Sequence, residues 1–306
     1  MDFNDGFIIL NKIEGCTSHD CIKIIRNHLN IKKVGHTGTL DPEVTGVLPI
    51  ALGNATRFIQ YLPQSKTYIG KIQLGLKTTT DDIYGDIIYQ NDIPKLDSSE
   101  IETHLDSFRG TFLQIPPKVS SVHVKGERAY KKFRRNENFE LPPKEVSVEN
   151  LILKNYDQAL GQITIEISCS SGTYIRSIAR DLGKTIKSEG CLAALIRTKA
   201  SGFKLENSIT IDNLKKEGNI NKIIIPISSA LDHLPKIILE NAEENLFWQT
   251  GRRIVIDERK LFSNNSISSK KVILVFNNQN VLLGLGNIVN IENNFLLQPK
   301  IVLNAK

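Results

Sequence analysis

The chain has 306 residues, 40% of them hydrophobic and 24% charged, which is typical of a soluble protein with a sizeable core. No apolar run is long enough to span a bilayer, and the acidic start lacks the basic residues of a signal peptide. We therefore expect a cytoplasmic protein with no membrane association. The net charge of +6 and the pI near 9.0 favour a polyanionic partner, although net charge alone is weak evidence.

The four cysteines are too few and too widely scattered for a disulfide framework. They also lack the Cys-x-x-Cys spacing of a structural metal site. We expect no metal, and we expect four reduced residues that pack in the interior: Cys16, Cys21, Cys169 and Cys191.

The first elements are a buried strand and an amphipathic helix. Residues 7–10 form a short apolar run that predicts a strand. Ser18 is typical of a helix N-cap, and Ile22, Ile25 and Leu29 recur at helical spacing. We therefore expect a helix that is capped by Ser18 and extends through Leu29.

A stretch rich in glycine and proline, residues 34–57, follows this helix. It places Gly35, Gly38 and Gly46 around Asp41, which directly precedes Pro42. Glycine permits backbone dihedrals that side chains forbid, and proline fixes its own φ and holds the preceding residue extended. The stretch therefore predicts a shaped loop, rather than a helix or strand, that presents Asp41. A lone Gly-Asp-Pro cluster could equally be a structural turn, but the unbroken length of this pattern favours a functional loop.

Further along, alternating and helical patterns occur in mixed order. The expected elements are a short helix at 54–62, a strand at 68–74, a second strand after Gly85, a helix at 99–108 capped by Asp97 or Ser98, and strands at 146–153 and 163–169.

Residues 118–135 are strongly basic, with seven Lys or Arg against one Glu. Such a run is usually a solvated face, but this one interleaves Tyr130 and Phe133 with the cations. Cations pair with phosphates and aromatic rings stack on bases, so the segment favours RNA or DNA binding.

An amphipathic pattern opens at Ser171 and predicts a helix whose apolar face includes Ile178 and Leu182. Arg176 and Arg180 lie off that face, four residues apart and on a shared side. An arginine in the first turn opposes the helix-dipole preference, so a carboxylate partner is the simplest reason for Arg176. An ordinary surface ion pair explains both arginines equally well at this point.

The pattern changes after Pro226, where a linker-like segment precedes short strands separated by Gly and Asn turns. The expected elements are strands at 236–239, 254–256, 272–276 and 281–285, with a short helix at 241–247. Their spacing predicts a small β-barrel or sandwich, and we place the domain boundary near residue 230.

Four stretches together resemble the motifs of the TruB family of tRNA pseudouridine synthases. The first is GHTGTLDPEVTGVLPIALGNATR, which contains the family's GxLDP element with its catalytic aspartate. The others follow in the family's order: KTYIGKIQLGLKTTTDDIYG, QIPPKVSSVHVKGERAY and CSSGTYIRSIARDLG. The resemblance is specific over about residues 7–200 and weaker beyond, where VLLGLGNI and LLQPKIV are similar to the end of a PUA-like domain.

The resemblance implies an α+β fold with a mixed, largely antiparallel central sheet flanked by helices. It implies a pseudouridine synthase catalytic domain at 1–230, with an RNA-gripping, thumb-like basic insert at about 116–147, and a small PUA-like β-barrel at 231–306. The implied reaction converts a uridine in the T loop of tRNA to pseudouridine, by base flipping, Asp-dependent cleavage of the glycosidic bond and reattachment through C5. No metal or cofactor is implied.

Matching positions imply three catalytic residues. Asp41 would attack the flipped uridine at its base or its ribose, as carboxylate nucleophiles do elsewhere. Tyr68 would stack on the uracil and help to remove a proton. Arg176 would pair with Asp41 and favour its charged form in a shielded pocket.

Further positions match residues that bind the substrate in the family. His36 would fill the space that the flipped uridine vacates. The implied base-pocket residues are Asp82, Tyr174 and Leu195, and the implied RNA-gripping cations of the insert are Lys125, Arg128, Lys131 and Lys132.

The implied partner is the T stem-loop of tRNA, and we expect a monomer that needs neither a guide RNA nor an obligate protein partner. Dyskerin-like enzymes of the same superfamily work inside guide-RNA complexes, but they generally lack the basic insert, which favours a stand-alone enzyme. Five positions outside the catalytic set depart from the family pattern: Ile13, Val119, Ser121, His123 and Ile196.

Two other classes of function remain open. The TGTL tetrapeptide beside Asp41 faintly resembles aspartyl-phosphate transfer sites, but the acid precedes the tetrapeptide in those sites and follows it here. A non-catalytic RNA-binding or RNA-folding protein would explain the basic segment and the C-terminal strands. It would leave the joint presence of Asp41, Tyr68 and Arg176 unexplained.

Overall fold

The computed structural model describes residues 5–257, 272–291 and 294–304. Its large sheet has nine strands: β1 (Gly6–Lys12), β2 (Val34–His36), β3 (Thr45–Leu52), β4 (Lys66–Leu74), β7 (Gly110–Gln114), β10 (Lys144–Asp157), β11 (Gln162–Cys169), β12 (Gly190–Ala200) and β13 (Phe203–Lys204). They lie in the order β1-β3-β12-β4-β11-β10-β7, with β2 beside β3 and β13 beside β12. The sheet is mixed, because β12 runs parallel to β3 and antiparallel to β4.

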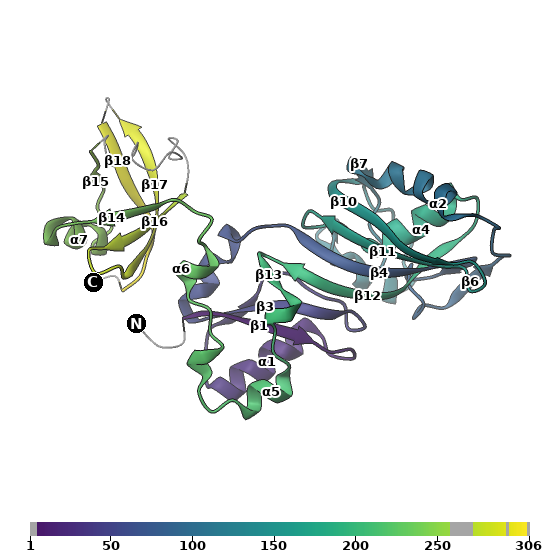
Figure 1. Ribbon diagram of the computed structural model, residues 1–306, viewed down its shortest axis with the longest axis horizontal. Helices are drawn as coiled ribbons and strands as arrows, with labels where there is room; N and C mark the ends of the chain where they lie inside the picture. Colours follow the sequence, from purple (N-terminus) through teal and green to yellow (C-terminus); the bar gives the residue numbers. More distant parts are fainter. Residues whose placement is uncertain (1–4, 258–271, 292–293, 305–306) are drawn as a thin grey trace.

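A second sheet lies at the C-terminal end of the molecule (Figure 1). Its five strands are β14 (Lys236–Leu239), β15 (Ile254–Val255), β16 (Val272–Asn277), β17 (Leu282–Ile291) and β18 (Asn294–Val302). Two small hairpins pair β5 (Leu76–Thr78) with β6 (Ile87–Gln90), and β8 (His123–Val124) with β9 (Glu127–Arg128). The expected α+β fold, with a mixed, largely antiparallel central sheet and a small C-terminal β unit, is confirmed, and the strands expected to form a PUA-like barrel lie in one sheet in the order β14-β16-β17-β18-β15.

The helices are α1 (Ser18–Leu29), α2 (Ser98–Leu105), α3 (Ala129–Arg134), α4 (Ile175–Thr185), α5 (Ile211–Lys216), α6 (Ile227–Ala230) and α7 (Ala242–Gln249). Short 3-10 turns occur at Gly53–Tyr61, Asp106–Phe108, Leu205–Asn207 and Ile220–Lys222. In Figure 1, α2 and α4 lie over the part of the large sheet that contains β10 and β11, whereas α1 and α5 lie near β1.

Strand β1 is buried on both faces, which explains why its residues 7–10 are all apolar rather than alternating. Ile8 and Leu10 belong to the core that includes α1, whereas Phe7 and Ile9 point into a second core. That second core also contains side chains of β16, β17 and β18. Residues of the linker-like segment pack there too, because α6 buries Ile227. The large sheet and the C-terminal sheet therefore share a hydrophobic interface.

Two central strands differ from the sequence-based expectation. β3 occupies part of the stretch whose glycines and prolines predict a loop, and β12 lies where the sequence pattern predicts no element. β3 contains Pro49, a residue that ordinarily argues against a central strand. Gly46 lies in β3 with a φ of +105°, and a Cβ there would be 2.2 Å from the Arg197 carbonyl oxygen. Glycine is thus required where β3 meets β12, and the true loop shrinks to residues 37–44.

Two helices begin differently from the prediction. Thr17, not Ser18, caps α1, and its side chain accepts a hydrogen bond from the Asp20 backbone N–H. The Ser18 hydroxyl instead bonds to both backbone groups of Leu40, at 2.8 and 3.0 Å. The later helix, α4, starts at Ile175 because the chain before it turns through a glycine with a positive φ.

Candidate active site

A buried lysine at the end of β1 fixes one side of the loop that carries Asp41. Lys12, at the end of β1, is 0% exposed. Its ammonium donates to the backbone oxygens of Ile13, Cys16 and Pro42 at 2.9, 2.7 and 2.8 Å. These bonds use all three donors of the ammonium group and fix the chain at the residue after Asp41. Burial lowers the pKa of Lys12 from its ordinary value.

A second buried cation, Arg197 of β12, holds the other side of the loop. It is 0% exposed. Its Nε donates to the Val47 oxygen at 2.7 Å, and its two Nη atoms donate to the oxygens of Gly38 and Thr39 at 3.0 and 3.5 Å. Arg197 also lies directly opposite Tyr68 in the pairing of β12 with β4, and the two side chains interact electrostatically. One side chain therefore connects the Asp41 loop with the tyrosine that is expected to stack on the base.

Three residues that support the site were not predicted: Lys12, Ser18 and Arg197. Their partners are mostly backbone groups, which leave no pairing pattern in the sequence. The sequence does contain one signal, which is a cation inside or beside a run of apolar residues. Such a cation is expected to be buried, and a buried charge needs several hydrogen bonds. Lys12 follows the apolar run 7–10, and Arg197 follows Leu195 and Ile196.

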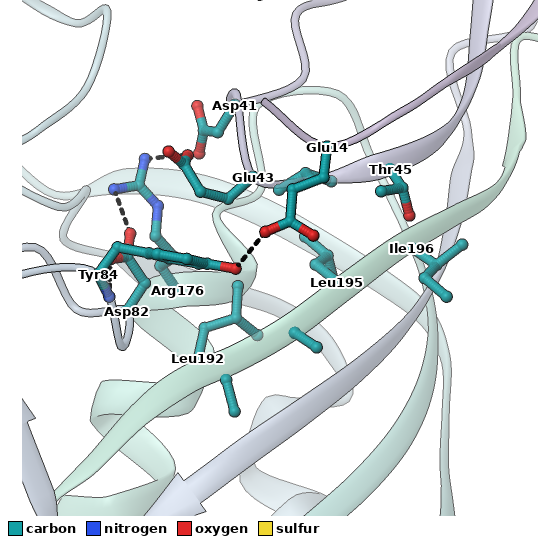
Figure 2. A pocket seen from close by; sticks show the side chains of 13 residues that line it. Glu14, Asp41, Glu43, Thr45, Asp82, Tyr84, Arg176, Leu192, Leu195 and Ile196 are labelled. Atoms are coloured by element: carbon teal, nitrogen blue, oxygen red, sulfur yellow. Dashed lines mark hydrogen bonds and ion pairs between the residues drawn. The ribbon is translucent and has the colours of Figure 1, made fainter. Parts of the chain in front are cut away.

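Arg176, in the first turn of α4, connects two carboxylates (Figure 2). Its Nη2 lies 2.8 Å from Asp41 Oδ2, and its Nη1 lies 3.4 Å from Asp82 Oδ2. The guanidinium also donates to the backbone oxygens of Thr80 and Val119. Arg176 is 8% exposed, whereas the Asp41 side chain is 47% exposed. The arginine is thus fixed, and it directs an accessible carboxylate.

Arg180, one turn further along α4, serves a different cluster. Its Nη1 lies 2.9 Å from Asp81 Oδ2, and its Nη2 lies 2.8 Å from Asp181 Oδ2. It also donates to the Ile115 backbone oxygen. Arg180 therefore ties α4 to neighbouring segments, while Arg176 alone of the two reaches Asp41.

Two cavities meet at the Asp41–Arg176 pair. The first, which we call the Glu14 cavity, has a volume of about 230 Å³. Glu14, Glu43 and Asp82 make it acidic (Figure 2). The Tyr84 hydroxyl donates to Glu14 Oε1 at 3.0 Å across this cavity. Asp82, expected in the base pocket, lines the Glu14 cavity and reaches the second cavity through Arg176.

The second cavity, which we call the Tyr68 cavity, has a volume of about 290 Å³. Tyr68, Tyr174 and Leu195 all line it, together with Asp41 and Arg176. Tyr68 is 7% exposed, and burial raises the pKa of its phenol above the ordinary value. The phenol is therefore protonated at neutral pH. An aromatic ring, an aliphatic side chain and a carboxylate in one cavity suit a planar heterocycle that reacts with the carboxylate.

His36 lies beside the Asp41 loop, at the end of β2, but does not line either cavity. Its Nδ1 accepts a hydrogen bond from the Gly38 backbone N–H at 3.2 Å. Burial, and then the positive charge of Arg197, lower the pKa of His36. A neutral imidazole is thus part of the loop structure.

We expect His36 to make stability depend on pH. Because its pKa is lowered on folding, the unfolded chain binds more protons, and stability is lost as the pH falls through the unfolded value of about 6.5. Melting temperatures of the wild type and of His36→Gln should therefore converge as the pH falls from 8 to 5, whereas His28→Gln, an exposed control, should track the wild type. A constant difference between the wild type and His36→Gln would contradict this assignment.

The basic insert forms the β8–β9 hairpin and α3. Lys125, Arg128 and Lys131 are exposed. Lys132 is instead paired with Glu137 at 2.9 Å and with Glu127 at 3.8 Å. Three of the four cations expected to grip RNA are therefore presented to solvent, and the fourth stabilises the insert itself.

Within the described ranges, no group of three His, Cys, Asp or Glu residues could hold a metal ion. The four cysteines are free, and three of them are buried. Burial raises the pKa of Cys21 and Cys169 to about 11 and that of Cys191 to about 12, as expected for inert packing residues. Across the part of the chain that the structure describes, none of the helices has the length and apolarity to traverse a membrane.

Comparison with solved structures defines the fold. A chain of a Cbf5-Nop10-Gar1 complex superposes with a TM-score of 0.74 and 23% identity, covering 98% of this chain and 85% of that one. A chain of an H/ACA RNP bound to a substrate RNA containing 2'-deoxyuridine gives a TM-score of 0.72 at 22% identity, covering 97% and 84%. At these identities the likeness shows a shared fold.

Comparison of sequences defines the family. Residues 26–175 match the profile of the TruB family pseudouridylate synthase N-terminal domain. A protein of Prochlorococcus marinus strain MIT 9515, called tRNA pseudouridine synthase B, is 58% identical over 100% of both chains. A protein of the same name from strain AS9601 is 56% identical, also over 100% of both chains. The chain therefore belongs to the TruB family of pseudouridylate synthases, and it is an enzyme.

Proposed function

We propose that this chain converts a uridine in the T loop of tRNA to pseudouridine, with Asp41 as the nucleophile. The observation that carries the proposal is the position of the Asp41 carboxylate. It lies 2.8 Å from Arg176 and lines the cavity that also contains Tyr68. The name shared by the full-length relatives, tRNA pseudouridine synthase B, supports tRNA as the substrate.

In the proposed reaction, Asp41 attacks the uridine at its base or at ribose C1′. The bond between C1′ and N1 breaks, the uracil rotates, and C5 bonds to C1′. The proton on C5 leaves, N1 gains a proton, and the Asp41 carboxylate is released. Arg176 pairs with this carboxylate and aims it at the substrate, and Asp82 holds Arg176 from its other side.

The substrate must leave the RNA stack to reach this carboxylate, which costs a few kcal/mol of stacking. We propose that the uracil enters the Tyr68 cavity, where it stacks on Tyr68 between Tyr174 and Leu195. His36 would fill the vacated space in the RNA. Lys125, Arg128 and Lys131, on the exposed insert, would contact phosphates of the T stem, with Lys132 as a support.

Unmodified tRNA labelled with tritium at C5 of uridine tests this function. Isomerisation must release the label into water, because C5 loses its hydrogen when it bonds to C1′. We expect release of one label per tRNA molecule at the T loop, and none from tRNA that already carries pseudouridine there. Tight tRNA binding without any release would instead favour a non-catalytic RNA-binding protein.

A further inference from the structure

The Tyr68 cavity contains a cation that the proposed chemistry does not use. Lys66, at the start of β4, lines this cavity, and its ammonium donates to the Ser171 hydroxyl at 3.3 Å. Within residues 5–257, 272–291 and 294–304, no carboxylate lies within ion-pair distance of it. Burial, and then the charge of Arg197, lower the pKa of Lys66. A partly buried cation without a counter-charge is costly, and an anion bound beside it would offset that cost.

The surroundings of Lys66 leave room for its ammonium and offer another donor. A Cβ at Gly38 would approach Lys66 Nζ to 3.0 Å, so glycine at this position keeps space for the ammonium. Ser120 lines the same cavity and is 6% exposed. Its hydroxyl is buried and lacks a hydrogen-bond partner among the described residues. A buried hydroxyl without a partner is uncommon in a folded protein, and a ligand oxygen would satisfy it.

The start of α4 faces this cavity as well, since Tyr174, Ile175 and Arg176 all line it. In the described structure, the N-cap Tyr174 makes no side-chain capping bond, and the first turn carries no acidic residue. An uncapped helix start attracts negative charge. Arg176 lies in the same turn, but its positive charge is already balanced by Asp41 and Asp82. The attraction for an anion therefore comes from the helix start and from Lys66.

The two cavities differ in charge, and this difference indicates which of them accommodates the RNA backbone. The Glu14 cavity is lined by Glu14, Glu43 and Asp82, which would repel an RNA backbone. The Tyr68 cavity is also lined by Asp41, but it contains Lys66 and the free hydroxyl of Ser120 as well. A nucleotide that reaches Asp41 would therefore place its base against Tyr68 and its anionic backbone toward Lys66.

We propose that Lys66, Ser120 and the start of α4 bind a phosphodiester that directly flanks the flipped uridine. This inference rests on the proposed function, because it assumes that the RNA presents a flipped uridine to the Tyr68 cavity. The site would hold the nucleotide by its backbone, independently of the base contacts, and would place the ribose near Asp41.

A neutral backbone linkage tests the site directly. T stem-loop RNA can be synthesised with a methylphosphonate in place of the phosphate on the 5′ or the 3′ side of the target uridine. We expect one of the two neutral linkages to weaken equilibrium binding to the wild-type protein about tenfold, as loss of a hydrogen bond to a charged group does. Lys66→Gln should bind all-phosphate RNA about tenfold more weakly, and should lose nothing further on the same neutral linkage.

Two further variants complete the test. Lys71→Gln makes the same change on the same strand, at an exposed position on the opposite face, and should behave as the wild type with every RNA. Ser120→Ala should weaken binding to all-phosphate RNA about threefold. The neutral linkage should then weaken binding less in this variant than in the wild type. The salt dependence of binding should fall by roughly 0.7 in logarithmic slope for Lys66→Gln.

Equal losses for the wild type and Lys66→Gln on each neutral linkage would overturn the phosphate site, as would wild-type binding by Lys66→Gln. The tritium-release assay on all-phosphate RNA reports separately on the proposed function. If tritium is released but the neutral linkage weakens binding equally for the wild type and Lys66→Gln, only the phosphate site is refuted. If Lys66→Gln removes the effect of the neutral linkage but no tritium is released, only the isomerase function is refuted.

Discussion

Replacing Asp41 with asparagine is expected to abolish isomerisation while leaving the fold and tRNA binding intact. The amide keeps the shape of the carboxylate but is a poor nucleophile, so we expect a loss of at least about 10⁴-fold in tritium release. Stability should change little, because the Asp41 side chain is 47% exposed and exposed ion pairs contribute little. Asp82 still pairs with Arg176 in this variant.

The matched control is Glu43→Gln, an acid-to-amide change two residues away in the Glu14 cavity. It should retain wild-type release, because no described contact links Glu43 to Arg176. Release should be measured in single turnover, with enzyme in excess, so that slow product dissociation does not mask the chemical step. Residual release by Asp41→Asn at more than a few per cent of the wild-type rate would show that another group is the nucleophile.

Asp41 and Arg176 could be predicted because their side chains are unusual for their local structure. An acid framed by glycines and followed by proline, and an arginine in the first turn of a helix, each demand an explanation beyond secondary structure. Their ion pair supplies it. The competing interpretation of Arg176 as a surface pair does not fit, because the guanidinium is buried.

The supports of the loop could not be predicted in the same way. Lys12 and Arg197 bond mainly to backbone carbonyls, which every residue carries, so no residue type marks their partners. β3 and β12 were not predicted because one residue interrupts the strand pattern of each. Pro49 interrupts the pattern of β3, and Arg197 interrupts that of β12, although tertiary contacts accommodate both residues.

Arg197→Met should destabilise the protein more than Asp41→Asn or His36→Gln does. Methionine can occupy the same buried space, but it leaves the oxygens of Gly38, Thr39 and Val47 without this donor. Unsatisfied buried acceptors cost about 1–3 kcal/mol each, so we expect the free energy of unfolding to fall by about 3–5 kcal/mol in urea titrations. Arg197→Lys should restore little of it, because one ammonium cannot match the fork of guanidinium donors.

The same variant should also slow the chemical step, since Arg197 binds the backbone of the Asp41 loop and lies opposite Tyr68 in the pairing of β12 with β4. Arg180→Met is the control: it removes a partly buried guanidinium from its partners Asp81 and Asp181 and should also destabilise the protein. At a temperature where both variants are folded, Arg197→Met should lose at least about tenfold in single-turnover release, and Arg180→Met should not. If both variants release tritium at the wild-type rate when folded, Arg197 stabilises the fold without positioning Asp41. If only Arg197→Met is slow, the fold places Asp41 and Tyr68 through one shared side chain, so the positions of these two residues cannot vary independently.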